Sequence, residues 1–248
     1  MDSNTILSPI SFLTIIPVPR SINTDLSIVA KNMHMFPIIG ALIGLIVGMF
    51  SFAISPYLTS YLVGLLVTIA TLLITGMHHA DALADFADGL MAKGARELKR
   101  RIMSEPALGT AGTLSLIIYV VGLIIAIATF NSALKLLFSF ISAEIIAKYV
   151  MVIIAAKSTP AWEGFSSPFT IAMKDKSKIA FATIFTVASI IILTGFMGLI
   201  AIAVALILAL IIRNVSYRSF GGITGDAFGA SNEIARLSSI IIFSQMIL

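Results

Sequence analysis

The chain has 248 residues, of which 58% are hydrophobic and 11% are charged, and its mean hydropathy is +1.06. Soluble globular proteins carry about 25% charged residues, so this composition excludes a soluble globular protein and predicts an integral membrane protein. The absence of cysteine excludes disulfides, thiolate metal sites and cysteine nucleophiles, and the modest net charge of +4 gives no reason to expect a nucleic-acid partner.

Apolar stretches of about 20 residues predict membrane-spanning helices. In chain order these stretches are 36–54, 57–77, 112–130, 133–156, two within 179–212 that separate near 194–198, and a last one from about Ile234 to the end. The first apolar stretch, 6–20, is short and contains three prolines, which favour an interfacial or re-entrant segment. We therefore predict an all-α, polytopic membrane bundle with about seven transmembrane helices, forming a single domain over residues 1–248.

The basic residues are distributed unevenly between the two sides of these predicted spans. Fourteen of the sixteen Lys and Arg residues agree with one orientation, and the exceptions are Lys135 and Lys148. The positive-inside rule then places the N-terminus and the loops 77–111, 157–178 and 213–233 in the cytoplasm, and the C-terminus outside. We expect a multi-pass protein of the cytoplasmic membrane whose short cytoplasmic loops hold the active site.

Three aspartates follow the second predicted span, within the sequence HHADALADFADGL at 78–90. Asp81, Asp85 and Asp88 are spaced i, i+4, i+7, which places them within about a 60° arc of one helix face. Stacked carboxylates repel one another unless a cation compensates them, and their oxygens suit Mg²⁺. The spacing predicts a magnesium site for a phosphate-bearing substrate, with a solvated acidic face as the alternative. Helical geometry places His78, rather than His79, on this face.

A basic segment, KGARELKRRIM at 93–103, comes next. Arg96, Arg100 and Arg101 are candidates for binding substrate phosphate groups, because guanidinium groups pair well with phosphate. The alternative is that these charges only orient the chain in the membrane. Gly109 and Gly112, which follow, allow another segment to approach the backbone closely.

A second polar motif, GGITGDAFGASNE, occupies 221–233. Its first glycines predict a flexible turn, after which Asp226 opens a helix with Glu233 on the same face. Asp226 is a candidate functional residue, and a helix N-cap role is the alternative. Gly225 and Gly229 form a small-xxx-small pair, which predicts tight helix packing.

Two features of the middle of the chain have structural interpretations. Glu144 and Lys148 are spaced i, i+4 within the fourth predicted span and are expected to pair inside the membrane, where ionisable residues are often functional. Trp162, the single tryptophan, is expected to be an aromatic anchor at the membrane interface.

The two polar motifs resemble those of a known family. HADALADFADGL (79–90) is similar to the signature H-x-D-G-L-A-D-x-x-D-G-L of the cobalamin-5'-phosphate synthases, also called adenosylcobinamide-GDP ribazoletransferases. GGITGDAFGASNE (221–233) resembles the second signature of that family, G-G-[IV]-T-G-D-x-x-G-A-x-x-E. Further similar segments, in the order of the family, are FLTIIPVPR (12–20), FPIIGALIG (36–44) and IMSEPALGTAG (102–112).

The resemblance implies a membrane-embedded, Mg²⁺-dependent transferase of late cobalamin biosynthesis. Its substrates would be adenosylcobinamide-GDP and α-ribazole or its 5'-phosphate, with release of GMP. The family's histidine falls on His79, which we expect to be the general base, with Asp226 as the second choice. The aspartates of the signatures fall on Asp81, Asp85, Asp88 and Asp226, with Asp81 and Asp85 expected in both metal binding and catalysis. Besides these substrates, the expected partners are the lipid bilayer and a second copy of the chain in a homo-oligomer.

Several positions depart from the family or add candidates to the site. Ala82 stands where the family has a glycine. In the segment 103–109, Glu105 stands where the family also has an acidic residue, but the family's basic residue is missing. Lys148 stands where the family has an arginine. The remaining candidates from the resemblance and from helical geometry are His78, Glu105, Lys148, Gly222, Thr224, Gly225 and Glu233.

Two other functions remain open. A CDP-alcohol phosphotransferase-like lipid enzyme also uses stacked helix aspartates and Mg²⁺, but Ala95-Arg96 comes two residues too late for that pattern and no D-x3-D follows. A cation transporter would place acidic residues along a path through the membrane. Here the aspartates map to the cytoplasmic edge, and only Glu144 and Lys148 lie deeper.

Overall fold

The computed structural model describes residues 3–246, and this part of the chain folds into helices joined by loops, with one isolated β-bridge between Pro160 and Ile223. The helices are, in chain order, α1 (Asn4–Leu13), α2 (Leu26–Lys31), the 3-10 turn η1 (Met33–Met35), α3 (Phe36–Ile54), α4 (Ser60–Ile74), α5 (His78–Met91), α6 (Arg96–Met103), α7 (Thr110–Ala128), α8 (Ala133–Ala156), α9 (Ser167–Ala172), α10 (Lys176–Thr194), α11 (Gly198–Phe220) and α12 (Gly225–Gln245).

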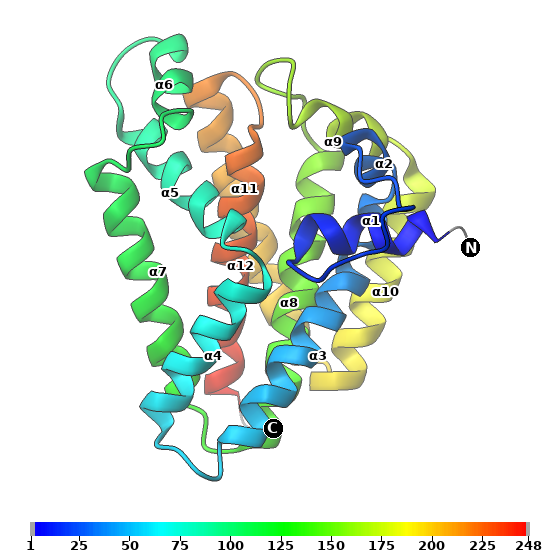
Figure 1. The fold of residues 1–248 in the computed structure, drawn as a ribbon, viewed down its shortest axis with the longest axis vertical. Helices are drawn as coiled ribbons and strands as arrows, with labels where there is room; N and C mark the ends of the chain where they lie inside the picture. The colour runs from blue at the N-terminus through cyan, green and yellow to red at the C-terminus, as the bar shows by residue number, and fades with distance from the viewer. Residues whose placement is uncertain (1–2, 247–248) are drawn as a thin grey trace.

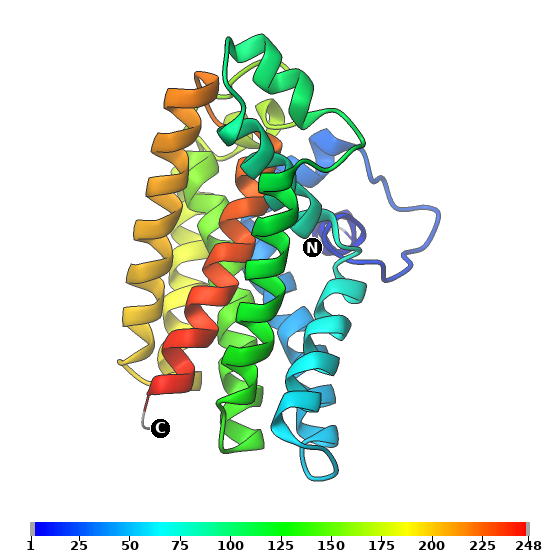
Figure 2. The ribbon, with the colours of Figure 1, turned by 90° about the vertical axis from the view of Figure 1, so that its left-hand side faces the viewer.

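The long helices run side by side and give the bundle two distinct ends (Figures 1 and 2). One end holds α5, α6, α9 and the turn 221–224, and we call it the site end. The loops 55–59, 129–132 and 195–197 lie at the opposite end. Helix α1 lies across the bundle in Figure 1 and is seen end-on in Figure 2, which agrees with the expectation that the segment 6–20 does not span the membrane.

The all-helical, multi-pass architecture predicted from the sequence is confirmed. Five segments are long and apolar enough to cross a membrane: Met33–Ile54, α7, α8, α10 and α11. A sixth results if α4 and α5, which are bent by 91°, count as one broken span. Helix α12 lies along the bundle as well (Figure 1) but is more polar, so the predicted count of about seven is approximate.

Two predicted boundaries are wrong, each for a local reason. The span 57–77 is shorter in the structure because Gly76 and Met77 adopt left-handed φ angles of 63° and 62°, which end α4 and turn the chain into α5. The last helix begins at Gly225, close to the helix start expected at Asp226 but well before the predicted span from about Ile234, because the Thr224 side chain caps it by accepting a hydrogen bond from the Ala227 N–H at 3.1 Å. The predicted loop 213–233 therefore shrinks to 221–224, and residues 247–248 of that predicted span lie outside the described residues.

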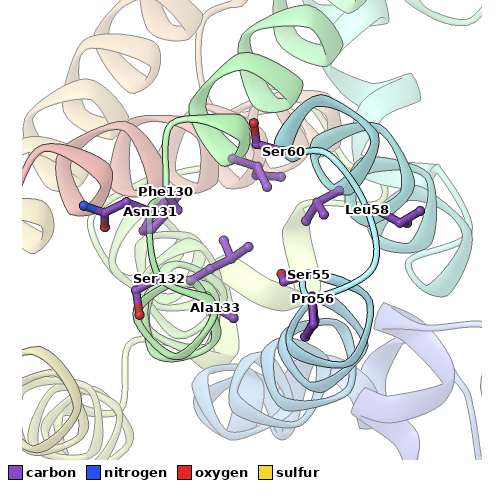
Figure 3. Close-up of a pocket in the computed structure, with 11 residues that line it drawn as sticks. Ser55, Pro56, Leu58, Ser60, Phe130, Asn131, Ser132 and Ala133 are labelled. Atoms are coloured by element: carbon purple, nitrogen blue, oxygen red, sulfur yellow. The ribbon is translucent and has the colours of Figure 1, made fainter.

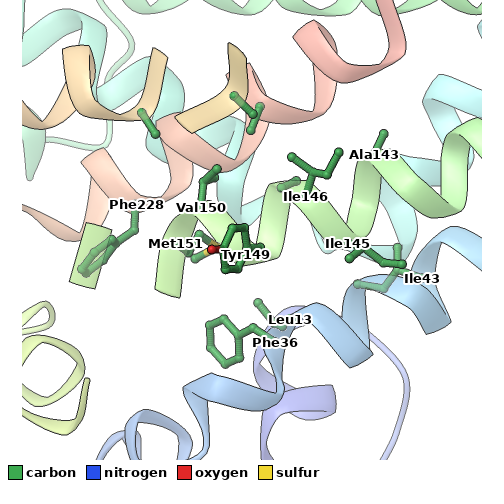
Figure 4. Close-up of a cluster of buried hydrophobic side chains, with 14 of the residues drawn as sticks. Leu13, Phe36, Ile43, Ala143, Ile145, Ile146, Tyr149, Val150, Met151 and Phe228 are labelled. Atoms are coloured by element: carbon green, nitrogen blue, oxygen red, sulfur yellow. The ribbon is translucent and has the colours of Figure 1, made fainter. Parts of the chain in front are cut away.

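Helix α8 forms the centre of the bundle, and 89% of its most apolar window is buried. Figure 4 shows its Ile145, Tyr149 and Met151 among side chains of α1, α3 and α12. Helix α3 approaches α8 closely because glycines face it and have no side chain. A Cβ on Gly44 would lie 2.6 Å from the Ile141 Cα, and one on Gly48 would lie 2.7 Å from the Leu137 side chain.

The opposite end contains a cavity of about 280 Å³ between the loops after α3 and α7 (Figure 3). Among the described residues, those that line it are serine, proline, asparagine and apolar side chains, and none of them titrates. The acidic residues of both sequence motifs lie at the site end, in α5 and α12.

Candidate active site

Helix α5 presents the acidic face predicted from the sequence. It starts at His78 after the left-handed Met77 and packs against α7 and α12. Its apolar side is fixed by Phe86, whose ring centroid lies 5.8 Å from that of Phe220 at the end of α11. Asp81 is consequently exposed and Asp85 half-buried.

Asp226 brings a fourth carboxylate to this face from the first turn of α12. It is not the helix N-cap, a role that belongs to Thr224. Helix α5 and this first turn lie outside the five candidate spans. Burial and the charges of Asp81, Asp226 and Asp88 raise the pKa of Asp85 to about 7. Burial and the charge of Asp81 raise the pKa of Asp226 to about 6. The cluster thus holds more negative charge than the protein compensates.

Asp88 has a different environment from the other aspartates. Its carboxylate accepts hydrogen bonds from the Gly109 N–H at 2.7 Å and the Gly112 N–H at 2.8 Å, at the start of α7. A Cβ on either glycine would collide with this carboxylate, so the close approach expected at these glycines is made by Asp88. Asp88, expected as a third metal ligand, therefore joins α5 to the N-terminus of α7.

The glycine motif positions Asp226 through backbone contacts. The Ala161 N–H donates to the Ile223 carbonyl at 2.9 Å, and the Ile223 N–H donates to the Thr159 carbonyl at the same distance. Gly222 is required because a Cβ there would lie 2.6 Å from the Pro160 carbonyl oxygen. The motif is therefore held against the segment that follows α8.

The small-xxx-small pair of α12 packs tightly, as expected. Gly229 faces α5, where a Cβ would clash with Ala82 and lie 3.3 Å from the His79 Cα. Gly225 faces Phe165, whose ring would lie 2.8 Å from an added Cβ. Ala82, which replaces the family's glycine, thus occupies the contact between the two motif helices.

The three candidate arginines lie at the site end but make protein contacts. The Arg100 guanidinium lies 4.8 Å from the centre of the Trp162 ring. Arg101 pairs with Glu105 at 3.2 Å on the surface. The Arg96 guanidinium lies against Gly221, where an added Cβ would be 2.7 Å from it. Trp162 lines a cavity at the site end, and its expected role as an interfacial anchor stays a prediction.

The expected pair of Glu144 and Lys148 is confirmed, with 2.8 Å between Lys148 Nζ and Glu144 Oε2. It belongs to a larger buried network, because Arg236 of α12 binds Glu144 and Glu233 and donates to the Tyr119 hydroxyl at 2.7 Å. The four charged side chains are at most 1% exposed. Glu233 thus lies deeper than Asp226, although the two were expected on one face.

The two histidines differ in their surroundings. His78 is exposed, whereas His79 is 7% exposed and its Nδ1 has no hydrogen-bond partner among the described residues. Burial, together with the charges of Lys148 and Arg236, lowers the pKa of His79 well below its usual value. His79 is therefore a neutral imidazole between the buried network and a cavity that it lines with Asp226.

The donor set fits a partly hydrated divalent cation better than a closed cage. Among residues 3–246, no group of three or more potential ligands is already assembled at metal-binding spacing. Mg²⁺ keeps several of its waters in proteins and is commonly held by one or two carboxylates together with substrate phosphates. The uncompensated charge around Asp85 supplies that kind of site.

Sequence reasoning missed Arg236, Tyr119 and Phe12 as parts of this region. Arg236 was counted among the cytoplasmic charges, yet it is fully buried. Its i, i+3 spacing from Glu233 was the available signal, because opposite charges at that spacing pair on a helix. Phe12 opens FLTIIPVPR, one of the segments that resemble the family, but nothing in the sequence places it or Tyr119 beside the two polar motifs.

Comparisons with known proteins agree with the motifs. Residues 5–244 match the model of the family described as cobalamin-5-phosphate synthase. An adenosylcobinamide-GDP ribazoletransferase of Methanosarcina barkeri is 31% identical and covers 97% of this chain and 91% of its own length. Proteins of that name from Methanococcoides burtonii and Listeria welshimeri are each 30% identical. The first match covers 95% of this chain and 90% of the relative. The second covers 94% of each. No solved structure matches the chain.

Proposed function

Because the chain belongs to the cobalamin-5-phosphate synthase family, we propose that it joins adenosylcobinamide-GDP to α-ribazole or its 5'-phosphate and releases GMP. Membership makes it a transferase of late cobalamin biosynthesis, and its apolar helices make it a multi-pass membrane protein. The observation that best supports this reaction is the group of carboxylates from α5 and α12, beside a helix with three arginines.

The pyrophosphate of the first substrate binds at the acidic face. Asp81, Asp85 and Asp226 would hold Mg²⁺ there, which would screen the charge of the pyrophosphate and of the departing phosphate. Asp88 keeps α5 and the start of α7 together through its two hydrogen bonds. Arg96, Arg100 and Arg101 contribute positive charge near the remaining phosphate oxygens.

The transfer step exchanges one phosphorus–oxygen bond for another. A ribose hydroxyl oxygen of α-ribazole forms a bond to the phosphorus on the cobinamide side. The bond from that phosphorus to the bridging oxygen breaks, and GMP leaves with that oxygen and its electron pair. The hydroxyl proton passes to His79, whose imidazole lines the cavity and whose Nδ1 has no hydrogen-bond partner among residues 3–246. Asp226, which lines the same cavity, is the second candidate for this role.

The first prediction tests this reaction. The substitution Asp85→Asn removes the central charge of the acidic face and is expected to lower Mg²⁺-dependent GMP release at least about 100-fold, the effect of losing one electrostatic stabiliser of a transition state. The assay follows GMP released from adenosylcobinamide-GDP by purified protein, with and without α-ribazole and Mg²⁺. Glu97→Gln, an exposed carboxylate on α6, serves as the control and should keep activity. Full activity of Asp85→Asn would contradict the proposal.

A further inference from the structure

A cavity of about 580 Å³ opens beside the acidic face, between α1, α5, α9 and the start of α12. Cavities of this size hold small organic ligands. The cavity is notable for its aromatic lining, which is formed by Phe12, Phe36, Trp162, Phe165, Phe169 and Phe228. Trp162, Phe165 and Phe169 come from one segment and the other three rings from three distant ones, so folding brings four parts of the chain together here.

One side of the cavity is an aromatic wall formed by Phe12, Phe165 and Phe169. Their ring centroids lie 5.9 Å apart for Phe12 and Phe165, 5.6 Å for Phe12 and Phe169, and 5.7 Å for Phe165 and Phe169. Phe169 is 2% exposed, but Phe165 is 48% exposed although it lines the cavity. A half-exposed ring on an otherwise packed aromatic wall leaves a planar apolar surface for a ligand ring.

The cavity lining also contains polar groups. His79 and Asp226 line it, and the Nδ1 of the buried His79 lacks a partner among residues 3–246. A ligand that matches both parts of the lining has a planar apolar ring and polar oxygen atoms. A nucleoside with an apolar base has this arrangement.

The proposed reaction includes three ring systems, and the cavity discriminates between them. A corrin macrocycle with its amide side chains is larger than this space. Guanine presents N1–H and 2-amino donors beside O6 and needs polar partners along that edge. The only carboxylate lining the cavity among the described residues is Asp226, which belongs to the acidic face. The dimethylbenzimidazole base of α-ribazole has two methyl groups and one free ring nitrogen, so it matches an aromatic wall.

We propose that this cavity binds the acceptor nucleoside, with its base against Phe12, Phe165 and Phe169 and its ribose toward His79 and Asp226. This assignment rests on the proposed function and adds the place of the second substrate. It also brings the ribose hydroxyls to the edge of the acidic face, where the pyrophosphate of the first substrate binds. Arg100, stacked on Trp162, then packs behind the cavity lining.

The single tryptophan gives a readout that does not depend on catalysis. Trp162 lines the cavity, so α-ribazole added to purified protein with a chelator and no first substrate should change its fluorescence in a saturable way. Phe165→Ala should weaken this binding about tenfold, because it removes a stacked aromatic ring and its apolar contact area. Phe165→Tyr keeps the ring and should bind nearly as tightly as the native protein. Phe196→Ala removes a phenylalanine that is 76% exposed at the opposite end, and it should leave binding unchanged.

Two results would overturn the assignment. One is an unchanged dissociation constant in Phe165→Ala; the other is a Trp162 response to GMP together with no response to α-ribazole. The proposed function is judged separately by GMP release. If α-ribazole-dependent GMP release persists while Trp162 does not respond to α-ribazole, the cavity assignment fails and the reaction stands. If neither occurs, the reaction itself is contradicted.

Discussion

The aspartates of α5 have the same chemistry but different surroundings. Asp81 is exposed, Asp85 is half-buried among three other carboxylates, and Asp88 accepts two backbone hydrogen bonds. The i, i+4, i+7 spacing predicted their common face, because side-chain direction follows from the helical period alone. The hydrogen bonds of Asp88 could not be predicted, because they depend on where α7 starts in space.

The raised pKa of Asp85 predicts how metal-free protein responds to pH. An unfolded aspartate titrates near 3.9, whereas Asp85 in the folded protein titrates at about 7. The folded state therefore binds more protons between these values, so stability falls as pH rises from about 4 to about 7 and then levels off. Asp85→Asn cannot ionise. It should raise the melting temperature of chelator-treated protein clearly at pH 8 and less at pH 5.

Thermal unfolding of the purified protein at the two pH values measures this difference. Asp175→Asn is a suitable comparison, because Asp175 is exposed and its pKa is lowered by hydrogen bonds from Ser177 rather than raised. That variant should gain no stability at pH 8. Equal melting temperatures for native protein and Asp85→Asn at pH 8 would contradict the assignment of Asp85 to a charge-crowded site.

At the level of elements, α8 and α12 are joined by the buried charge network. Lys148 and Glu144 of α8 and Glu233 and Arg236 of α12 give two positive and two negative charges. The sequence predicted the pair within α8, since the i, i+4 spacing is local. It did not predict the contacts between helices, because the last span was expected to start only near Ile234. The helical stretch from Asp226 to Glu233 was therefore expected in the cytoplasmic loop 213–233, and Arg236 was counted with the cytoplasmic charges.

The balance of this network predicts a difference between single and double variants. Lys148→Met leaves a buried carboxylate without its ammonium partner and should destabilise the protein by about 3–5 kcal/mol. In Lys148→Met the network has two carboxylates for the single cation Arg236. Adding Glu144→Gln removes the excess negative charge, while Arg236 keeps Glu233 as its partner. The double variant should therefore melt at a higher temperature than Lys148→Met alone. A double variant that is less stable than the single variant would show that the network is not balanced in this way.

For the whole molecule, the two exceptions to the charge bias have structural explanations. Lys148 is paired inside the bundle, and Lys135 donates a hydrogen bond to the Met246 carbonyl at the end of α12. Neither residue is free to orient the chain. The long apolar stretches predicted the membrane class and most helices, because a membrane span depends only on the composition of about 20 consecutive residues. The aromatic cavity was not predicted, since the segment with Trp162, Phe165 and Phe169 meets Phe12, Phe36 and Phe228 only in the folded bundle.

We expect the site end to face the cytoplasm, because it holds α6 with Arg96, Lys99, Arg100 and Arg101. The chain has no cysteine, so a single introduced cysteine reports its own location. Glu97→Cys places a thiol on the exposed surface of α6, and Tyr57→Cys places one in a loop of the opposite end, where Tyr57 is 84% exposed. A membrane-impermeant maleimide applied to intact cells should label Tyr57→Cys and should label Glu97→Cys only after permeabilisation. Cells that express the native chain give the background, and the reverse labelling pattern would place the acidic face outside, away from nucleotides made in the cytoplasm.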